Sequence, residues 1–150
     1  GANMSDDKKA AKDLVETLKD GENGFASAAE KLKDGEHPEW ATTLQRLAGQ
    51  RAGFRQEIVA LGHDYGDDVD ESGSAVAAVH RGWLSLKDAL TGDDAGGVLG
   101  AAVTGEDHTV SEYEKALDQD LSDGFREVVK RQHGEVVSAR GEVKALQSAS

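Results

Sequence analysis

The sequence predicts an all-α fold, and three observations lead to this prediction. Apolar residues return every three or four positions over long stretches, which is the period of an amphipathic helix. Proline occurs once, at Pro38, and only 5% of the 150 residues are aromatic. A chain of several β-strands would show more Pro-Gly and Asn-Gly turn signals and more alternation of β-branched residues. We therefore expect helices throughout, packed around one core.

The amino-acid composition argues against several classes of binding partner and excludes cysteine chemistry. Lys and Arg number 17 against 29 Asp and Glu, which gives a net charge of −12. Such a surface repels nucleic-acid phosphates and anionic lipids, so we expect neither nucleic acid nor membrane as a partner. Without cysteine the chain has no disulfide, thiolate metal ligand or thiol nucleophile. No membrane-length apolar run or signal peptide is found, so a cytoplasmic location is expected.

The chain is expected to form one domain of two helical hairpins. Residues 1–3 are interpreted as the remnant of a cleavage site before Met4, and residues 4–150 as a single domain. The first helix is expected to run to about residue 33 and to end at Gly35. Pro38 should open the second helix, which ends at Gly62. The short turn between them indicates an antiparallel hairpin.

The second hairpin is expected to follow a long connection. Residues 63–74 are acidic, and a short amphipathic helix should come next, with Val76, Val79, Trp83, Leu86 and Leu90 on its apolar face. The third long helix contains Glu106 and the fourth begins after Ser122. A connection of roughly thirty residues is far longer than antiparallel neighbours need. We therefore predict an antiparallel four-helix bundle with a crossover segment, containing a short helix, between the second and third long helices.

Polar residues interrupt the apolar stripes at one common depth. Glu106 lies within the stripe formed by Leu99, Ala102, Val103, Val110, Tyr113 and Leu117. Burying a carboxylate is costly unless it is paired, protonated or bound to a metal. The other three long helices place polar residues at the same level, namely Glu22, Gln50, Arg51, Gln132 and Glu135. Three carboxylates against one guanidinium leave excess negative charge, so at least one carboxylate should be protonated or reach water.

Several stretches resemble a known family. They are Lys19–Phe25, Gln50-Arg51, His80–Trp83 with Leu86-Lys87, Leu90–Gly92 and Gly105–Asp107. In this order they resemble a bacterial family of ferritin-like four-helix-bundle proteins of unknown function. The ferritin-like superfamily holds a di-metal carboxylate site, to which one helix of each hairpin gives a Glu and the other gives Glu-x-x-His.

The metal-binding motif of that superfamily is incomplete here. Glu22 and Glu106 match the two single-Glu positions, but the second helix has Gln50-Arg51-Ala52-Gly53 and the fourth has Gln132-His133-Gly134-Glu135. No Glu-x-x-His occurs in the chain. Arg51, if it points inward, brings a permanent positive charge to the position of the cations. The resemblance therefore implies the fold and a degenerate carboxylate site.

Three hypotheses of function follow. The first is a non-catalytic bundle without a cofactor, which acts through its surface or its oligomer, with a homodimer among the states considered and a stress setting among the roles. The second is an iron or manganese protein with oxidoreductase or iron-handling activity, which uses Glu22, Glu106 and Glu135 as ligands. The third is a protein-interaction adaptor that presents the crossover helix around Trp83.

Two weaker motifs complete the sequence analysis. Residues 68–73 resemble the first half of a calcium loop, but Val79 stands where a bidentate Glu is required, which favours an acidic linker. His133 lies one residue from the inner stripe, where it is either a ligand or a partly exposed histidine. No Ser-His-Asp set, phosphate loop or nucleotide fingerprint supports a hydrolase, kinase or dehydrogenase.

Overall fold

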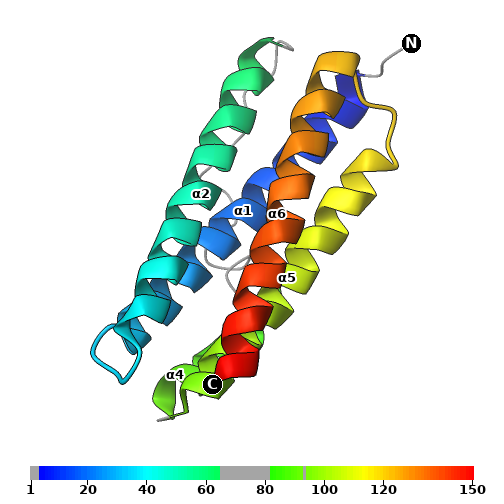
Figure 1. Ribbon diagram of the computed structural model, residues 1–150. Coiled ribbons are helices and arrows are strands. Elements are labelled where there is room, and N and C mark those ends of the chain that lie inside the picture. Colours follow the sequence, from blue (N-terminus) through cyan, green and yellow to red (C-terminus); the bar gives the residue numbers. More distant parts are fainter. Residues whose placement is uncertain (1–3, 65–81, 93) are drawn as a thin grey trace.

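The computed structural model describes residues 4–64, 82–92 and 94–150. These residues form five helices and no strand: α1 (Met4–Leu32), α2 (Pro38–Asp64), α4 (Leu84–Thr91), α5 (Ala95–Leu117) and α6 (Asp123–Ala149). The all-α prediction is confirmed. The four long helices lie side by side as a bundle (Figure 1). None of the described helices has both the length and the apolar character of a membrane span.

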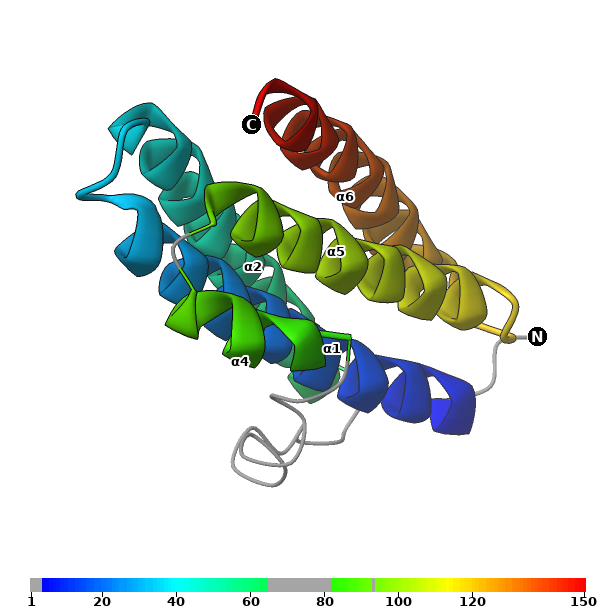
Figure 2. The same ribbon diagram turned by 90° about the horizontal axis from the view of Figure 1, so that it is seen from below.

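Two antiparallel hairpins make up the bundle. α1 packs along α2, α5 packs along α6, and α1 also lies against α5. The short helix α4 lies on the outside of this α1–α5 face (Figure 2). α2 ends near the opposite end of the bundle from α4 (Figure 1), which is the arrangement that a crossover requires. The predicted architecture therefore agrees with the structure.

The helix boundaries differ from expectation in a few places. α4 begins at Leu84, and the expected start of that helix around Val76 lies outside the described residues, as does the calcium-loop segment at 68–73. The N-cap of α5 is Asp94, whose side chain accepts a hydrogen bond from the backbone N–H of Gly96 at 2.9 Å. Ser122 is the N-cap residue of α6, but its side chain makes no capping bond.

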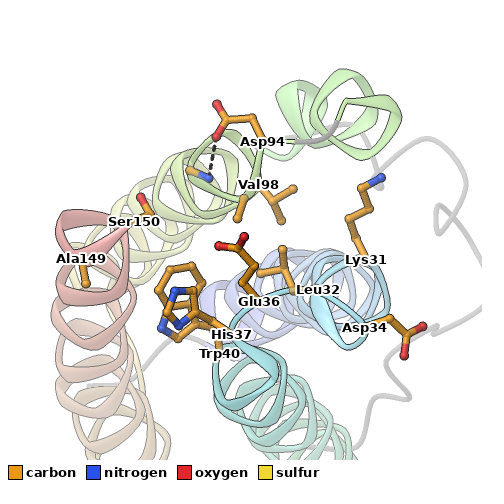
Figure 3. Close-up of a pocket in the computed structure, with 13 residues that line it drawn as sticks. Lys31, Leu32, Asp34, Glu36, His37, Trp40, Asp94, Val98, Ala149 and Ser150 are labelled. Atoms are coloured by element: carbon orange, nitrogen blue, oxygen red, sulfur yellow. Dashed lines mark hydrogen bonds between the residues drawn. The ribbon is translucent and has the colours of Figure 1, made fainter.

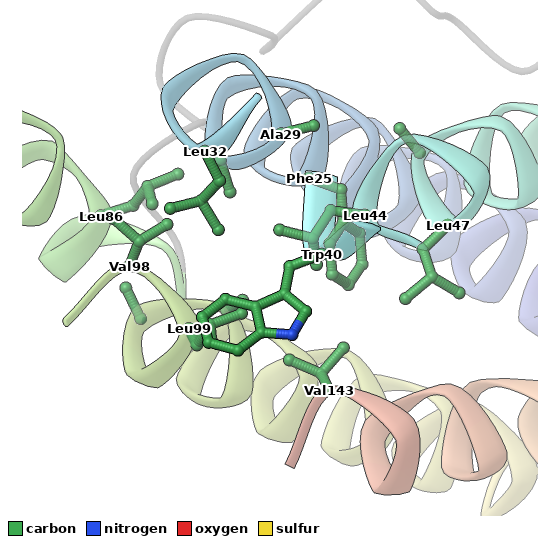
Figure 4. Packing of buried hydrophobic residues seen from close by; sticks show 14 of the residues in the cluster. Phe25, Ala29, Leu32, Trp40, Leu44, Leu47, Leu86, Val98, Leu99 and Val143 are labelled. Atoms are coloured by element: carbon green, nitrogen blue, oxygen red, sulfur yellow. The ribbon is translucent and has the colours of Figure 1, made fainter. Parts of the chain in front are cut away.

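The interior consists of two apolar clusters with a polar layer between them. The first lies where α1 ends and α2 begins, and it is built around Trp40, Leu44, Leu47, Val98, Leu99 and Val143 (Figure 4). The second fills the other end and includes Leu14, Leu18, Ile58, Phe125, Val129 and Val136. Arg51, Glu106 and Gln132 are fully buried in the middle of their helices, between these two clusters. Three of the six residues expected at this depth, Arg51, Glu106 and Gln132, are thus buried, whereas Gln50 is partly exposed.

Candidate functional site

The centre of the bundle holds a buried ion pair between α2 and α5. Arg51 donates through Nη1 to Oε1 of Glu106 and through Nη2 to Oε2 at 2.7 Å. Both side chains have 0% exposure to solvent. Such a bidentate arrangement is the strongest form of the Arg–carboxylate pair, because two parallel charge-assisted hydrogen bonds add to the Coulomb attraction. Arg51 thus points inward and takes Glu106 as its partner.

Neighbouring groups cover the rest of the Arg51 guanidinium. Nε donates to Oε1 of Gln50 at 3.1 Å, so Gln50 acts as a hydrogen-bond acceptor for the arginine. The ring of Phe25 lies 5.2 Å from the guanidinium carbon, within the range of a cation–π contact. A Cβ added at Gly21 would meet the arginine side chain at 3.6 Å, so α1 approaches it closely here.

Two of the expected inner carboxylates lie elsewhere. The side chain of Glu22 is 29% exposed and accepts from Nη2 of Arg55 at 3.1 Å and from its Nε at 3.3 Å. The placement of Glu135 on the inner face is wrong. Its side chain is 49% exposed and pairs with Arg131 one turn earlier on α6, at 3.5 Å. Both carboxylates reach water, so Glu106 keeps Arg51 as its counter-charge without competition from them.

A second polar network crosses the core beside the ion pair. The hydroxyl of Tyr113 donates to Oε1 of Gln132 at 2.6 Å, and Nε2 of Gln132 donates to Oε1 of Glu57 at 2.7 Å. Arg131 also donates to Glu57, at the surface. Burial of Tyr113 raises the pKa of its hydroxyl well above the ordinary value, so this hydroxyl remains a hydrogen-bond donor. The network links a buried tyrosine to an exposed ion pair.

Sequence reasoning missed Glu57, Arg55 and the role of Phe25 in this region. Glu57 is adjacent to the fully buried Ile58, which was the available signal that it lies at the edge of the core. His133 is partly exposed, with Nε2 4.0 Å from a carboxylate oxygen of Glu114 and its ring 6.5 Å from that of Tyr113. It borders the network and does not contact the ion pair.

The donor set does not fit the di-metal site of the ferritin-like superfamily. In the part of the chain that the structure describes, no three His, Asp or Glu side chains gather so that they could hold a metal ion. The three expected ligands diverge, since Glu106 faces Arg51, Glu22 faces Arg55 and Glu135 faces solvent. Two divalent cations would also meet the positive charge of Arg51 in this position.

A pocket of about 520 Å³ lies at the end of the bundle, away from the ion pair. Figure 3 shows the carboxylate of Glu36 directed into it, beside His37 and Trp40, whose rings stack at 4.0 Å. Asp94 turns instead to the N–H of Gly96, and His37 Nδ1 lies 2.9 Å from a carboxylate oxygen of Glu39. We place the candidate site at the ion pair, because the charged side chains of this pocket are all exposed, whereas Arg51 and Glu106 are withdrawn from water.

Comparisons with known proteins agree with this description. The family described as "Domain of unknown function (DUF2383)" matches residues 8–119, so the chain belongs to that family. Among solved structures, a mutant of Dps1 from Mycobacterium smegmatis is similar, with a TM-score of 0.79 and 14% sequence identity over 96% of each chain. At this identity the likeness shows the fold alone, a ferritin-like helical bundle. No curated protein matches the chain in sequence.

Proposed function

We propose that this member of the DUF2383 family is a non-catalytic ferritin-like bundle, in which the Arg51–Glu106 ion pair takes the place of a metal centre. The observation that carries the proposal is the bidentate contact of a fully buried guanidinium with a fully buried carboxylate. The function then lies at the surface of the bundle or in its assembly, and the interior serves to fix the helices.

Charge balance supports this proposal. One guanidinium neutralises one carboxylate, so the Arg51–Glu106 pair carries no net charge for a divalent cation to compensate. A cation near Glu106 would have to displace Arg51, and the displaced guanidinium would remain in an apolar interior. An unpaired buried charge costs several kcal/mol. The competition between cation and guanidinium therefore favours the ion pair.

The ion pair also suits a structural role. A buried pair adds little net stability compared with well-packed apolar residues, but it can specify which helices meet and in what register. Here it joins α2 of the first hairpin to α5 of the second. Gln132 of α6 makes a further link to α2 through Glu57. We therefore assign the polar layer the role of fixing the docking of the two hairpins.

The alternative of an iron or manganese protein is tested directly. The wild type and Glu106→Gln would be purified without a tag from cells grown in metal-replete medium, and their metal content measured by elemental analysis. Anaerobic titration of both proteins with Fe(II) and Mn(II), followed by calorimetry, would then measure binding. Glu127→Gln is the matched control, because this exposed carboxylate of α6 is not one of the expected metal ligands. We expect no stoichiometric iron or manganese in any of the three. Stoichiometric metal that is lost in Glu106→Gln and kept in Glu127→Gln would overturn the proposal.

The residue on which the adaptor hypothesis depended, Trp83, is not available at the surface of this structure. Trp83 is 4% exposed and packs into the bundle, whereas the next residue, Leu84, is 64% exposed. Function through the surface therefore requires residues other than Trp83. Light scattering would test the first candidate assembly, a homodimer, by the mass in solution.

A further inference from the structure

The indole of Trp83 occupies a narrow slot between α1 and α5. A Cβ added at Gly24 of α1 would lie 2.4 Å from Cε3 of the indole, and one added at Gly105 of α5 would lie 2.2 Å from Cε2. Real Cβ contacts essentially never fall below 3.0 Å, so any residue larger than glycine at either position would have to displace the ring. The slot therefore exists only because two helix-interior residues lack a side chain.

The slot lies next to the buried ion pair. The ring of Phe25 meets Trp83 edge to face, with the centroids 5.1 Å apart and the planes at 73°. The same Phe25 ring lies 5.2 Å from the guanidinium carbon of Arg51. The chain also links the two features directly, since Gly105 precedes Glu106. Trp83, Phe25 and Arg51 thus form a continuous series from the crossover to the centre of the bundle.

Shape, and not hydrogen bonding, holds the indole. Within the described part of the chain, Nε1 of Trp83 is buried and has no hydrogen-bond partner. A buried N–H without a partner is unfavourable, so the ring must be retained by its apolar contacts. These contacts include the side-chain-free positions Gly24 of α1 and Gly105 of α5, where a planar bicyclic aromatic group fits.

We propose that the cleft between Gly24 and Gly105 is a binding slot for a planar aromatic ring, filled in this chain by its own Trp83. The ring fastens the crossover to the bundle and, through Phe25, keeps water away from the Arg51 side of the ion pair. Trp83 is in this sense a positioning residue. The proposal does not depend on whether the bundle binds metal, so the metal titration and the experiments below can fail independently.

A glycine-to-alanine series tests the slot. Gly53→Ala and Gly141→Ala are the controls, because a Cβ added there meets nothing within 4 Å. These two should raise Tm by about 1–4 °C, since alanine restricts the unfolded chain and favours helix. Gly24→Ala and Gly105→Ala should instead lower Tm and shift the ¹⁹F resonance of 5-fluoro-Trp83. If the two pairs of variants raised Tm alike, the slot would be refuted.

Chemical rescue tests the ligand class. Trp83→Gly should lower Tm and speed the exchange of the Arg51 Nε–H with solvent, measured by ¹⁵N NMR. Indole at millimolar concentration should reverse both changes, as apolar ligands fill engineered cavities in other proteins. Benzothiophene, which has the same shape without the N–H, should rescue at least as well. A rescue of Tm that left the Arg51 exchange unchanged would refute the role of Trp83 in shielding the ion pair.

A second variant covers the case in which Trp83→Gly does not fold. Trp83→Leu keeps apolar volume without a planar ring and should show a smaller loss of Tm but the same faster exchange of the Arg51 Nε–H. Wild-type exchange in Trp83→Leu would overturn the proposal. Absence of any indole effect on folded Trp83→Gly would overturn it as well.

Discussion

The hydroxyl of Tyr113 donates to Oε1 of Gln132 at 2.6 Å, and both side chains are fully buried. Since Oε1 is the acceptor, the amide nitrogen of Gln132 faces α2. There it donates to the backbone oxygen of Phe54 at 3.3 Å and to Oε1 of Glu57 at 2.7 Å. One tyrosine on α5 therefore fixes the orientation of the amide that joins α6 to α2.

Replacing this tyrosine tests the network. Tyr113→Phe should lower the free energy of unfolding by about 1–3 kcal/mol, because it leaves Oε1 of Gln132 buried without its donor. Urea unfolding followed by circular dichroism would measure the loss. In a Gln132→Leu background the same tyrosine change should have a much smaller effect, since the orphaned acceptor is gone. Equal losses in the two backgrounds would show that the hydrogen bond carries no coupling.

The buried ion pair should show strong coupling in a double-mutant cycle. Arg51→Met and Glu106→Leu should each lower the free energy of unfolding by about 3–5 kcal/mol, because each leaves the opposite charge buried and unpaired. The double variant should be more stable than either single variant, since apolar side chains of similar volume then meet. Chemical denaturation of all four proteins measures the coupling. If the loss of unfolding free energy in the double variant equalled the sum of the two single losses, the pairing would be contradicted.

Acid should weaken the link between α2 and α6. Burial acts against the charge of Glu57, but hydrogen bonds from Arg131 and Gln132 outweigh it and hold the pKa of Glu57 below its ordinary 4.5. A carboxyl whose pKa is lowered in the folded state stabilises the protein above 4.5, and this contribution is lost as pH falls through the folded pKa. The contribution is modest, because the side chain is 37% exposed and its ion pair is screened.

The measurement for Glu57 is the stability of Glu57→Gln relative to the wild type between pH 3 and pH 7, roughly the window in which carboxyls titrate. The difference between the two proteins should shrink as the pH falls. Glu127→Gln on α6 is the control for the removal of an exposed carboxylate. A Glu57→Gln difference that grew toward low pH would have the wrong sign for this account.

Helical spacing predicted much of the fold and half of the site. Arg51, Glu106 and Gln132 each stand between apolar neighbours one turn away, so their side chains had to face the core. The same spacing argument placed Glu135 on the inner face, and this was wrong for an energetic reason. From Gln132 the next inward position is either three or four residues on, and Val136 takes it with 0% exposure. Burying valine is favourable where burying a carboxylate is costly, so Glu135 turns outward.

Partner choice between helices could not be predicted in this way. Glu22 lies four residues after Leu18, but Gly21 takes the place beside Arg51 and leaves Glu22 at the edge, with Arg55. Which arginine meets which carboxylate depends on the rotation and register of two helices packed together. A stripe of one helix contains no information on either quantity. The slot for Trp83 was missed for the same reason, since it needs Gly24 and Gly105 to face each other.

The last prediction concerns the start of α6, where a neighbouring helix supplies the cap. Asp7 of α1 is 1% exposed, and its Oδ1 accepts from the backbone N–H of Ser122 at 2.9 Å. Asp7→Ala should lower the free energy of unfolding by about 0.5–2 kcal/mol, the usual effect of removing a cap, and speed amide exchange at Ser122. Asp6→Ala is the control, because Asp6 shares the first turn of α1 but accepts from the N–H of Asp120 in an exposed bond at 3.1 Å. If both variants lost the same free energy of unfolding, the effect would come from the interaction of these carboxylates with the dipole of α1 and not from the cap.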